Sequence, residues 1–127
     1  MSIKTIYSHR APKPIGPYSQ AIQFANLLFT SGQIAMDPET SEIVGTDVEA
    51  QTEQVLKNLT AVLTAAGATL NSVLKTTIYI KNMDDFPKVN EVYAQFFNKS
   101  LPARSTVEVS RLPKNVLVEI DCIAKVE

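Results

Sequence analysis

Apolar and polar residues follow two different periods along the chain, and the changes between them predict the order of its elements. Short segments that alternate or are rich in β-branched residues predict strands, whereas apolar residues at steps of three and four predict helices. Ala21–Phe24 and Leu27–Ser31 are strand-like on either side of Asn26, a residue that tolerates a tight turn. The two segments are therefore expected to form a β-hairpin.

Two apolar stripes at helical spacing predict two helices. The first begins at about Val48 and ends before Gly67, whose freedom to adopt a left-handed conformation suits the residue after a helix. The second follows Asp84 and Asp85 and carries Pro87 in its first turn, where a missing N–H does no harm. The stripe residues are Val48, Val55, Leu59, Val62, Leu63 and Ala66 in the first helix, and Val89, Val92, Tyr93 and Phe96 in the second.

Three further segments predict strands. Ser72–Ile80 is rich in β-branched residues and is expected to lie inside a sheet. Arg104–Val109 and Val116–Val126 both alternate and are expected to pair as an antiparallel hairpin. Residues 1–127 are therefore expected to form one α+β domain with two helices on one face of the sheet.

The last strand predicts two unequal sheet faces, because every second side chain points the same way. The residues expected to meet the helices are Val118, Ile120, Cys122 and Ala124, and those on the other face are Leu117, Glu119, Asp121 and Ile123. Arg104 of the preceding strand is expected to share this second face. The mixture is too polar for a core and too apolar for open solvent. It predicts a homo-oligomer with charged groups in its interface clefts.

The composition narrows the classes of function. The 127 residues are 45% hydrophobic and 20% charged, which is typical of a globular protein. A net charge of −1 without basic runs argues against nucleic acid or an anionic membrane surface as a partner.

No apolar run is long enough to span a membrane, and the first residues lack the apolar core of a secretory signal, so the protein is expected in the cytoplasm. One cysteine, Cys122, and one histidine, His9, are too few for a zinc site.

Two charged residues and one aromatic residue are candidates for chemistry. The planar guanidinium of Arg104 can bind a carboxylate through two parallel hydrogen bonds, but an ion pair with Glu108, Glu119 or Asp121 explains it equally well. Glu119 can act as an acid and a base if its surroundings adjust its pKa, although most strand carboxylates are solvated. Tyr18 follows a stiff proline-rich loop, and it either walls a pocket or packs the edge of the hairpin.

Short motifs spread over the chain occur in the order of a known family. They are Ala11-Pro12, Ile15-Gly16-Pro17-Tyr18-Ser19-Gln20-Ala21, Thr30-Ser31-Gly32-Gln33-Ile34, Lys75-Thr76-Thr77-Ile78-Tyr79, Val89-Asn90-Glu91-Val92-Tyr93, Pro102-Ala103-Arg104-Ser105, Arg111-Leu112-Pro113 and Val118-Glu119-Ile120. Through these motifs the chain resembles the Rid/YjgF family of reactive intermediate deaminases, and its RidA-like members, over essentially its whole length.

The resemblance implies a chorismate-mutase-like α+β protomer with a mixed six-stranded sheet, assembled as a barrel-like homotrimer with sites between subunits. It implies an enzyme that hydrolyses 2-aminoacrylate and 2-iminobutanoate-type enamines and imines to 2-oxo acids and ammonia. No cofactor and no metal are implied, because the carbon of the imine tautomer is already electrophilic.

The resemblance also assigns roles to individual residues. Arg104 is implied to bind the substrate carboxylate, and Glu119 to activate water and carry protons to the leaving nitrogen. The other implied substrate-binding residues are Tyr18, Ser31, Gly32, Asn90 and Thr106. Thr106 stands where many members carry a cysteine, so activity is expected without a thiol at this position.

Two other functions fit parts of this pattern. A trimer that only binds and senses 2-oxo acids would use the same Arg104 fork, and only turnover distinguishes it from an enzyme. An endoribonuclease or translation inhibitor, activities ascribed to some relatives, would need a basic surface. A chain with pI ≈ 5.8 does not favour that function.

Overall fold

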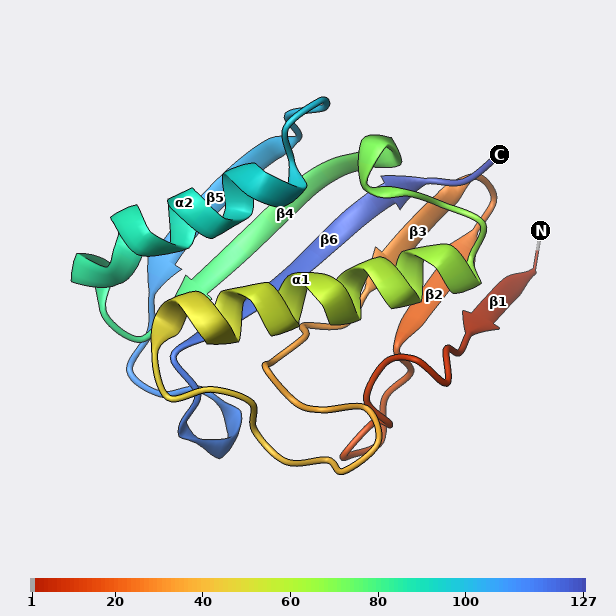
Figure 1. The fold of residues 1–127 in the computed structure, drawn as a ribbon. Coiled ribbons are helices and arrows are strands. Elements are labelled where there is room, and N and C mark those ends of the chain that lie inside the picture. Colours follow the sequence, from red (N-terminus) through yellow and green to blue (C-terminus); the bar gives the residue numbers. More distant parts are fainter. Residues whose placement is uncertain (1) are drawn as a thin grey trace.

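After a first strand that the apolar pattern does not predict, the strands and helices follow one another in the predicted order (Figure 1). The computed structural model describes residues 2–127. Its strands are β1 (Ile3–Ile6), β2 (Ala21–Phe24), β3 (Leu27–Thr30), β4 (Val73–Ile80), β5 (Ala103–Glu108) and β6 (Val118–Lys125). Its helices are α1 (Val48–Ala65) and α2 (Phe86–Phe96), and short 3₁₀ turns lie at Leu70–Ser72, Met83–Asp85 and Pro113–Asn115.

The six strands form one mixed sheet in the order β1-β2-β3-β6-β4-β5. β2 and β3 make the predicted hairpin, and Ala25 takes a left-handed φ of 55° at its turn. β4 lies between β6 and β5, which confirms its predicted interior position. Both helices cover the same face of the sheet, as expected (Figure 1).

The predicted hairpin of the last two strands is wrong. β5 pairs in parallel with β4, and β6 lies between β3 and β4, antiparallel to both. The reason is that α2 carries the chain back along the sheet, so β5 enters beside β4 in the same direction, as a crossover connection requires. β6 then fills the position between the N-terminal hairpin and β4, where partners pair along both of its edges.

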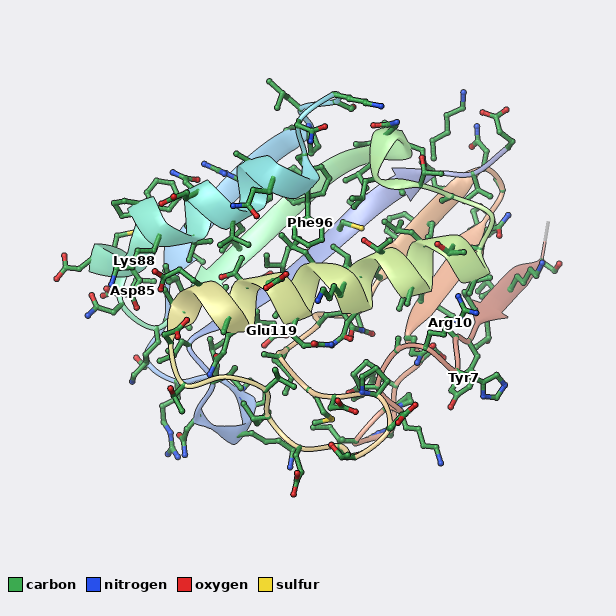
Figure 2. All side chains as sticks on the ribbon, in the orientation of Figure 1. Tyr7, Arg10, Asp85, Lys88, Phe96 and Glu119 are labelled. Carbon is green, nitrogen blue, oxygen red and sulfur yellow. The ribbon has the colours of Figure 1, made fainter. Side chains whose placement is uncertain are left out.

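The core lies between the helices and the sheet, where apolar side chains fill the space (Figure 2). The predicted inward-facing residues of β6, from Val118 to Ala124, are each no more than 2% exposed. Among them, burial raises the pKa of the Cys122 thiol to about 12, so this cysteine behaves as a small apolar residue. Phe97, 2% exposed just after α2, extends the core beyond the predicted stripe.

The opposite face of the sheet is not covered by either helix (Figure 1). A row of apolar side chains crosses it, because Ile22 pairs with Phe29 and Phe29 pairs with Ile123. Phe29 is 43% exposed, and Glu119 and Asp121 follow along the same side of β6. This open face therefore has the mixed apolar and acidic character that the alternation of β6 predicts. Over residues 2–127, no helix has both the length and the hydropathy needed to cross a membrane.

One buried amide joins the long loop before α1 to the helix itself. Asn58, 1% exposed, donates from Nδ2 to the carbonyl oxygens of Ile34 and Met36 at 3.1 and 2.9 Å. Its Oδ1 accepts a hydrogen bond from Gln54 at 2.9 Å. This one side chain supplies the donor to the Met36 carbonyl and a second donor, beside the Met36 N–H, to the Ile34 carbonyl. It thereby holds the chain beyond Gly32 against α1.

Replacing Asn58 with alanine should destabilise the fold. Asn58→Ala leaves the Met36 carbonyl without a donor and removes one of the two donors to the Ile34 carbonyl, which should lower the free energy of unfolding by about 1–3 kcal/mol. Urea unfolding followed by circular dichroism measures the change. Asn98→Ala is the control, because Asn98 makes only an exposed hydrogen bond to Gln95. Equal stabilities of the two variants would contradict this role.

Candidate functional site

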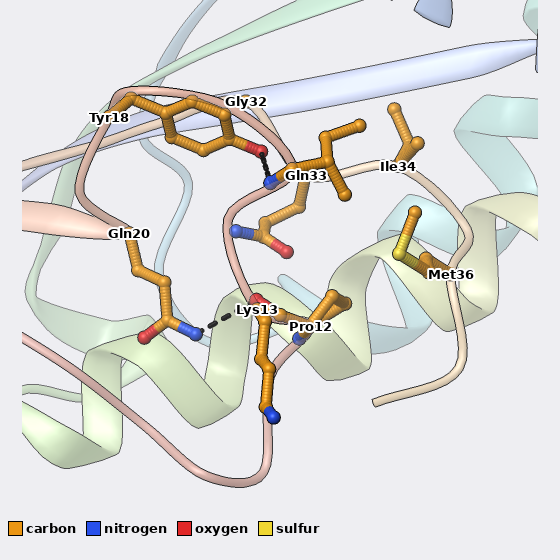
Figure 3. A pocket seen from close by; sticks show the side chains of 9 residues that line it. Pro12, Lys13, Tyr18, Gln20, Gly32, Gln33, Ile34 and Met36 are labelled. Carbon is orange, nitrogen blue, oxygen red and sulfur yellow. Dashed lines mark hydrogen bonds between the residues drawn. The ribbon is translucent and has the colours of Figure 1, made fainter. Parts of the chain in front are cut away.

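Gln20 holds the proline-rich loop that precedes β2, and it is 1% exposed. Its side-chain oxygen accepts a hydrogen bond from the Ser8 N–H at 2.6 Å. Its amide nitrogen donates to the carbonyl oxygens of Ser8, Ala11 and Pro12, and Figure 3 shows the bond to Pro12. The loop, whose prolines exclude helix, is thereby closed on itself and anchored at the start of the hairpin.

The hydroxyl groups of Tyr18 and Ser31 differ in what they can still offer to a ligand. Tyr18 Oη accepts the N–H of Ile15 at 3.2 Å, so its own O–H remains free to donate (Figure 3). Ser31 Oγ donates to the carbonyl of Ser19 at 2.5 Å, so its oxygen is left as an acceptor. The tyrosine can therefore donate a hydrogen bond to a bound molecule, whereas the serine can accept one.

Glu119 packs directly against the backbone of Gly32. Two hydrogen bonds, from Gln33 N to Ile120 O at 2.8 Å and from Ile120 N to Gln33 O at 3.1 Å, hold the Gly32 segment beside β6. A Cβ atom at position 32 would lie 1.9 Å from Glu119 Oε2. A side chain at position 32 would therefore displace the Glu119 carboxylate from its place beside the backbone.

The surroundings of Glu119 disfavour its charged form. Burial raises the pKa of its carboxyl group, and the nearby charge of Asp121 raises it further. The pKa of Asp121 is also raised, mainly by burial. A carboxyl group with a raised pKa can more readily take up and return a proton near neutral pH.

These residues form an open pocket of about 360 Å³ on one side of the protein. Its lining residues are Ile15, Tyr18, Ser31, Gly32, Ile34, Pro113 and Glu119. The structure thus brings together four of the predicted site residues, namely Tyr18, Ser31, Gly32 and Glu119. We call this set the carboxylate half-site.

Arg104 lies on the other side of the sheet, so the expectation that it shares a face with Glu119 is wrong. β5 pairs Arg104 with Thr76, a residue of β4 that is 0% exposed beneath the helices, whereas Glu119 pairs with Tyr79 on the open face. The error follows from the wrong hairpin, since parallel pairing with β4 sets which side each residue of β5 faces.

The alternative interpretation of Arg104 as an ion-pair partner is also wrong. Among residues 2–127 the ion pairs are Lys57–Glu53 and Lys125–Glu127, so Arg104 has none with Glu108, Glu119 or Asp121. Its guanidinium instead lies over the rings of Phe86 and Tyr93. The positive charge is therefore not neutralised by a carboxylate of its own chain.

A second pocket, of about 350 Å³, opens beside Arg104 and is lined also by Tyr93, Leu101 and Pro102. Two further predicted site residues belong to the adjacent elements, Thr106 to β5 and Asn90 to α2. Within the described part of the chain, Thr106 Oγ1 and Asn90 Oδ1 are buried polar atoms without a hydrogen-bond partner. We call Arg104, Asn90 and Thr106 the arginine half-site. The sheet separates it from the carboxylate half-site.

Three residues next to these half-sites were not predicted from the sequence pattern as parts of a site. Gln20 stands in a loop motif, where burial of an amide has no periodic signal. Tyr93 belongs to the predicted apolar stripe of α2, and Phe86 lies seven residues before it, so neither residue signals a role toward Arg104.

Comparison with known proteins decides the family. The family model described as Endoribonuclease L-PSP matches residues 8–126. The chain belongs to the Rid/YjgF/L-PSP family. Relatives within this family include a RutC family protein of Pyrococcus horikoshii, 60% identical over 95% of this chain and 96% of its own length. Another is the chloroplastic Reactive Intermediate Deaminase A of Arabidopsis thaliana, 50% identical over 95% of this chain and 65% of its own.

Solved structures of the Rid family confirm the predicted α+β fold with its mixed six-stranded sheet and two helices. A conserved Rid family protein of Yersinia pestis has a TM-score of 0.96 and 52% identity, covering 98% of this chain and 100% of its own. TdcF of E. coli, solved with bound serine, has a TM-score of 0.93 and 43% identity, covering 98% and 99%. The resemblance drawn from the sequence motifs is therefore confirmed at the level of the family.

Enlarging residue 32 should displace Glu119. Gly32→Ala places a methyl group where the carboxylate lies, so it should lower the free energy of unfolding by about 1–3 kcal/mol and move the Glu119 side chain. Chemical denaturation and a crystal structure of the variant measure both effects. Gly16→Ala is the control, because an added Cβ there meets the Tyr18 ring only at 3.6 Å. An unmoved Glu119 in Gly32→Ala would contradict the close packing.

Neutralising Glu119 should change how stability depends on pH. Because the folded state raises this pKa, the ionised carboxylate destabilises the fold above the raised pKa, and this cost disappears as pH falls toward the ordinary value of about 4.5. Glu119→Gln should therefore melt at a higher temperature than the wild type at pH 8, with the difference shrinking toward pH 4. Glu91→Gln, at an exposed position of α2, is the control. A difference that grows as pH falls would reverse the sign and refute this account of Glu119.

Proposed function

We propose that this protein is an enamine/imine deaminase that hydrolyses 2-aminoacrylate and 2-iminobutanoate-type intermediates to 2-oxo acids and ammonia. The observation that carries the proposal is the pair of half-sites. One offers an arginine without a carboxylate partner, and the other offers a carboxyl group with a raised pKa beside a free tyrosine hydroxyl. A relative that is 50% identical bears the name Reactive Intermediate Deaminase A, which agrees with this reaction. We place the reaction in the cytoplasm.

The active site is proposed to form between chains of a homotrimer. Arg104 and Glu119 lie on opposite sides of the sheet, so one chain cannot bring both to one small substrate. The apolar row on the open face, from Ile22 through Phe29 to Ile123, offers a surface for a second copy. Packing one chain against the next brings the arginine half-site of one to the carboxylate half-site of its neighbour.

The proposed reaction needs only these side chains and water. The Arg104 fork binds the substrate carboxylate, which positions the imine carbon. Glu119 takes a proton from water as the water oxygen bonds to that carbon. It returns this proton to the nitrogen, which becomes the amine of a tetrahedral intermediate. The proton of the new hydroxyl group then passes through Glu119 to the same nitrogen, and ammonia leaves as the C–N bond breaks and the C=O bond forms. An enamine substrate first tautomerises to the imine by protonation at its terminal carbon.

The other polar side chains of the two half-sites have free hydrogen-bonding capacity that the proposed hydrolysis can use. The free O–H of Tyr18 can donate to the substrate, and the oxygen of Ser31 can accept from its nitrogen. Over the described residues, Asn90 Oδ1 is a buried acceptor without a donor, and Thr106 Oγ1 is a buried hydroxyl, able to donate or accept, without a partner. A bound molecule or an ordered water can satisfy both atoms. Neither step uses a thiol, so Thr106 is compatible with activity.

Turnover tests the proposed function directly. A threonine dehydratase generates the unstable enamine and imine in situ, and release of ammonia and 2-oxobutanoate is compared with the spontaneous rate. Arg104→Ala and Glu119→Gln should each lower kcat/KM by at least about 100-fold, because they remove positioning and proton transfer respectively. Lys88→Ala is the control, since Lys88 is an exposed cation on α2 outside both half-sites (Figure 2).

Two other outcomes would replace the proposal. A wild type that adds nothing to the spontaneous rate but binds 2-oxobutanoate would be a 2-oxo acid sensor. RNA cleavage that persists through purification and disappears in Arg104→Ala would establish an endoribonuclease. The net charge of −1 argues against the ribonuclease.

Disrupting the open face should separate the chains. Phe29→Glu places an unpaired charge in the proposed interface, so sedimentation should change from a trimer to a monomer, and turnover should fall at least ten-fold. Met83→Glu, an equally drastic change at a residue 38% exposed beside α2, should leave the trimer intact. A wild type that sediments as a monomer at micromolar concentration would refute the proposed assembly.

A further inference from the structure

No ion pair restricts the motion of the Arg104 side chain, so other contacts must do so. It is exposed on β5, which is the edge strand of the sheet, and neither ion pair in the described part of the chain includes it. A long flexible side chain in such a position loses conformational freedom when it binds a ligand, which weakens binding. A carboxylate partner would hold it, but would also compete for the N–H groups that the ligand needs.

Two aromatic rings of α2 take the place of that partner. The Arg104 Cζ atom lies 5.3 Å from the centre of the Phe86 ring and 4.9 Å from that of Tyr93. Both distances are within the range of an attractive cation–π contact. The rings are seven residues apart, so they lie two turns apart on one face of the helix. A ring attracts the cation but has no carboxylate oxygen, so it does not neutralise the positive charge.

The Tyr93 ring is itself fixed on both sides. Its hydroxyl makes a 2.8 Å hydrogen bond with Thr76 Oγ1, and its ring stacks on Phe97 with centroids 4.6 Å apart. Thr76 is also the β4 neighbour of Arg104 in the strand register. Strand pairing with β4 therefore places the backbone of Arg104, and the rings of α2 contact its side chain.

We propose that Phe86 and Tyr93 are positioning residues that hold the Arg104 guanidinium ready for a planar carboxylate. The identity of that ligand, a 2-imino or 2-oxo acid, rests on the proposed function, but the holding of Arg104 does not. Lysine at position 104 would not reproduce the arrangement, because it lacks both the planar fork and the preference for stacking on rings.

Binding of 2-oxobutanoate, measured by calorimetry, tests the proposal. Phe86→Leu and Tyr93→Leu should each raise Kd about five-fold by removing one ring contact. The aromatic replacement Phe86→Tyr should keep Kd within about two-fold of the wild type, since a ring remains. Tyr93→Phe keeps its ring but loses the hydrogen bond to Thr76, so its Kd should lie between those of the wild type and Tyr93→Leu. Phe96→Leu is the matched control, because Phe96 is a partly buried ring of the same helix without a contact to Arg104 (Figure 2).

A second readout does not depend on the ligand. The Arg104 Nε–H resonance, assigned by its loss in Arg104→Lys, should show faster side-chain motion in Phe86→Leu and Tyr93→Leu but not in Phe96→Leu. If the wild type binds no 2-oxobutanoate, this resonance alone decides the positioning role, while turnover decides the proposed function separately. Unchanged motion in both ring variants, unchanged Kd in both, or an equal effect of Phe96→Leu on Kd would overturn the proposal.

Discussion

A sheet covered on one face only is the constraint on which the rest of this structure depends. Side chains alternate along β6, so each residue that enters the core places its neighbour on the open face. Val118 and Ile120 are 0% exposed under the helices, and Glu119 between them therefore faces the other way. Parallel pairing with β4 turns Arg104 toward the helix side. The sheet thus separates a cationic group from an acidic one.

Because the sheet separates them, one half-site has a cation without an acid, and the other has an acid without a cation. On one side the Arg104 guanidinium contacts two rings and no carboxylate, and Asn90 Oδ1 and the Thr106 hydroxyl are buried without hydrogen-bond partners among residues 2–127. On the other side Glu119 has a raised pKa and no cation to lower it. A carboxylate with an electrophilic carbon and a nitrogen beside it matches both sets of unmet needs. In the proposed trimer, packing on the exposed apolar row of the open face brings the two half-sites of neighbouring chains together.

Much of the fold could be predicted because it depends on local pattern. The stripe of α1, the β2–β3 hairpin and the alternation of β6 each follow from residues close in sequence. The pairing of β5 could not be predicted in this way, because a parallel partner is chosen by the path of α2 across the sheet and has no local signal. The wrong face for Arg104 followed from that error, since pairing decides which way an alternating strand presents its side chains.

In the candidate site, too, the sequence predicted the residues but not the contacts that form between distant elements. The resemblance to a family named the residues of both half-sites, but naming them did not place them on opposite sides of the sheet. The close approach of Gly32 to Glu119 and the two rings at Arg104 depend on distances across elements. Burial of the Gln20 amide depends on a loop that closes around it. Such contacts become visible only when the elements are assembled.

The central claim is that one chain supplies the arginine and another supplies the carboxylate. Mixing inactive Arg104→Ala and Glu119→Ala proteins, unfolded and refolded together with distinct tags, tests it most directly. In a random equal mixture, about a quarter of the sites between chains would unite an intact Arg104 with an intact Glu119. The account therefore predicts that about a quarter of wild-type turnover returns. Tag capture that proves mixed assembly without any return of turnover would contradict it.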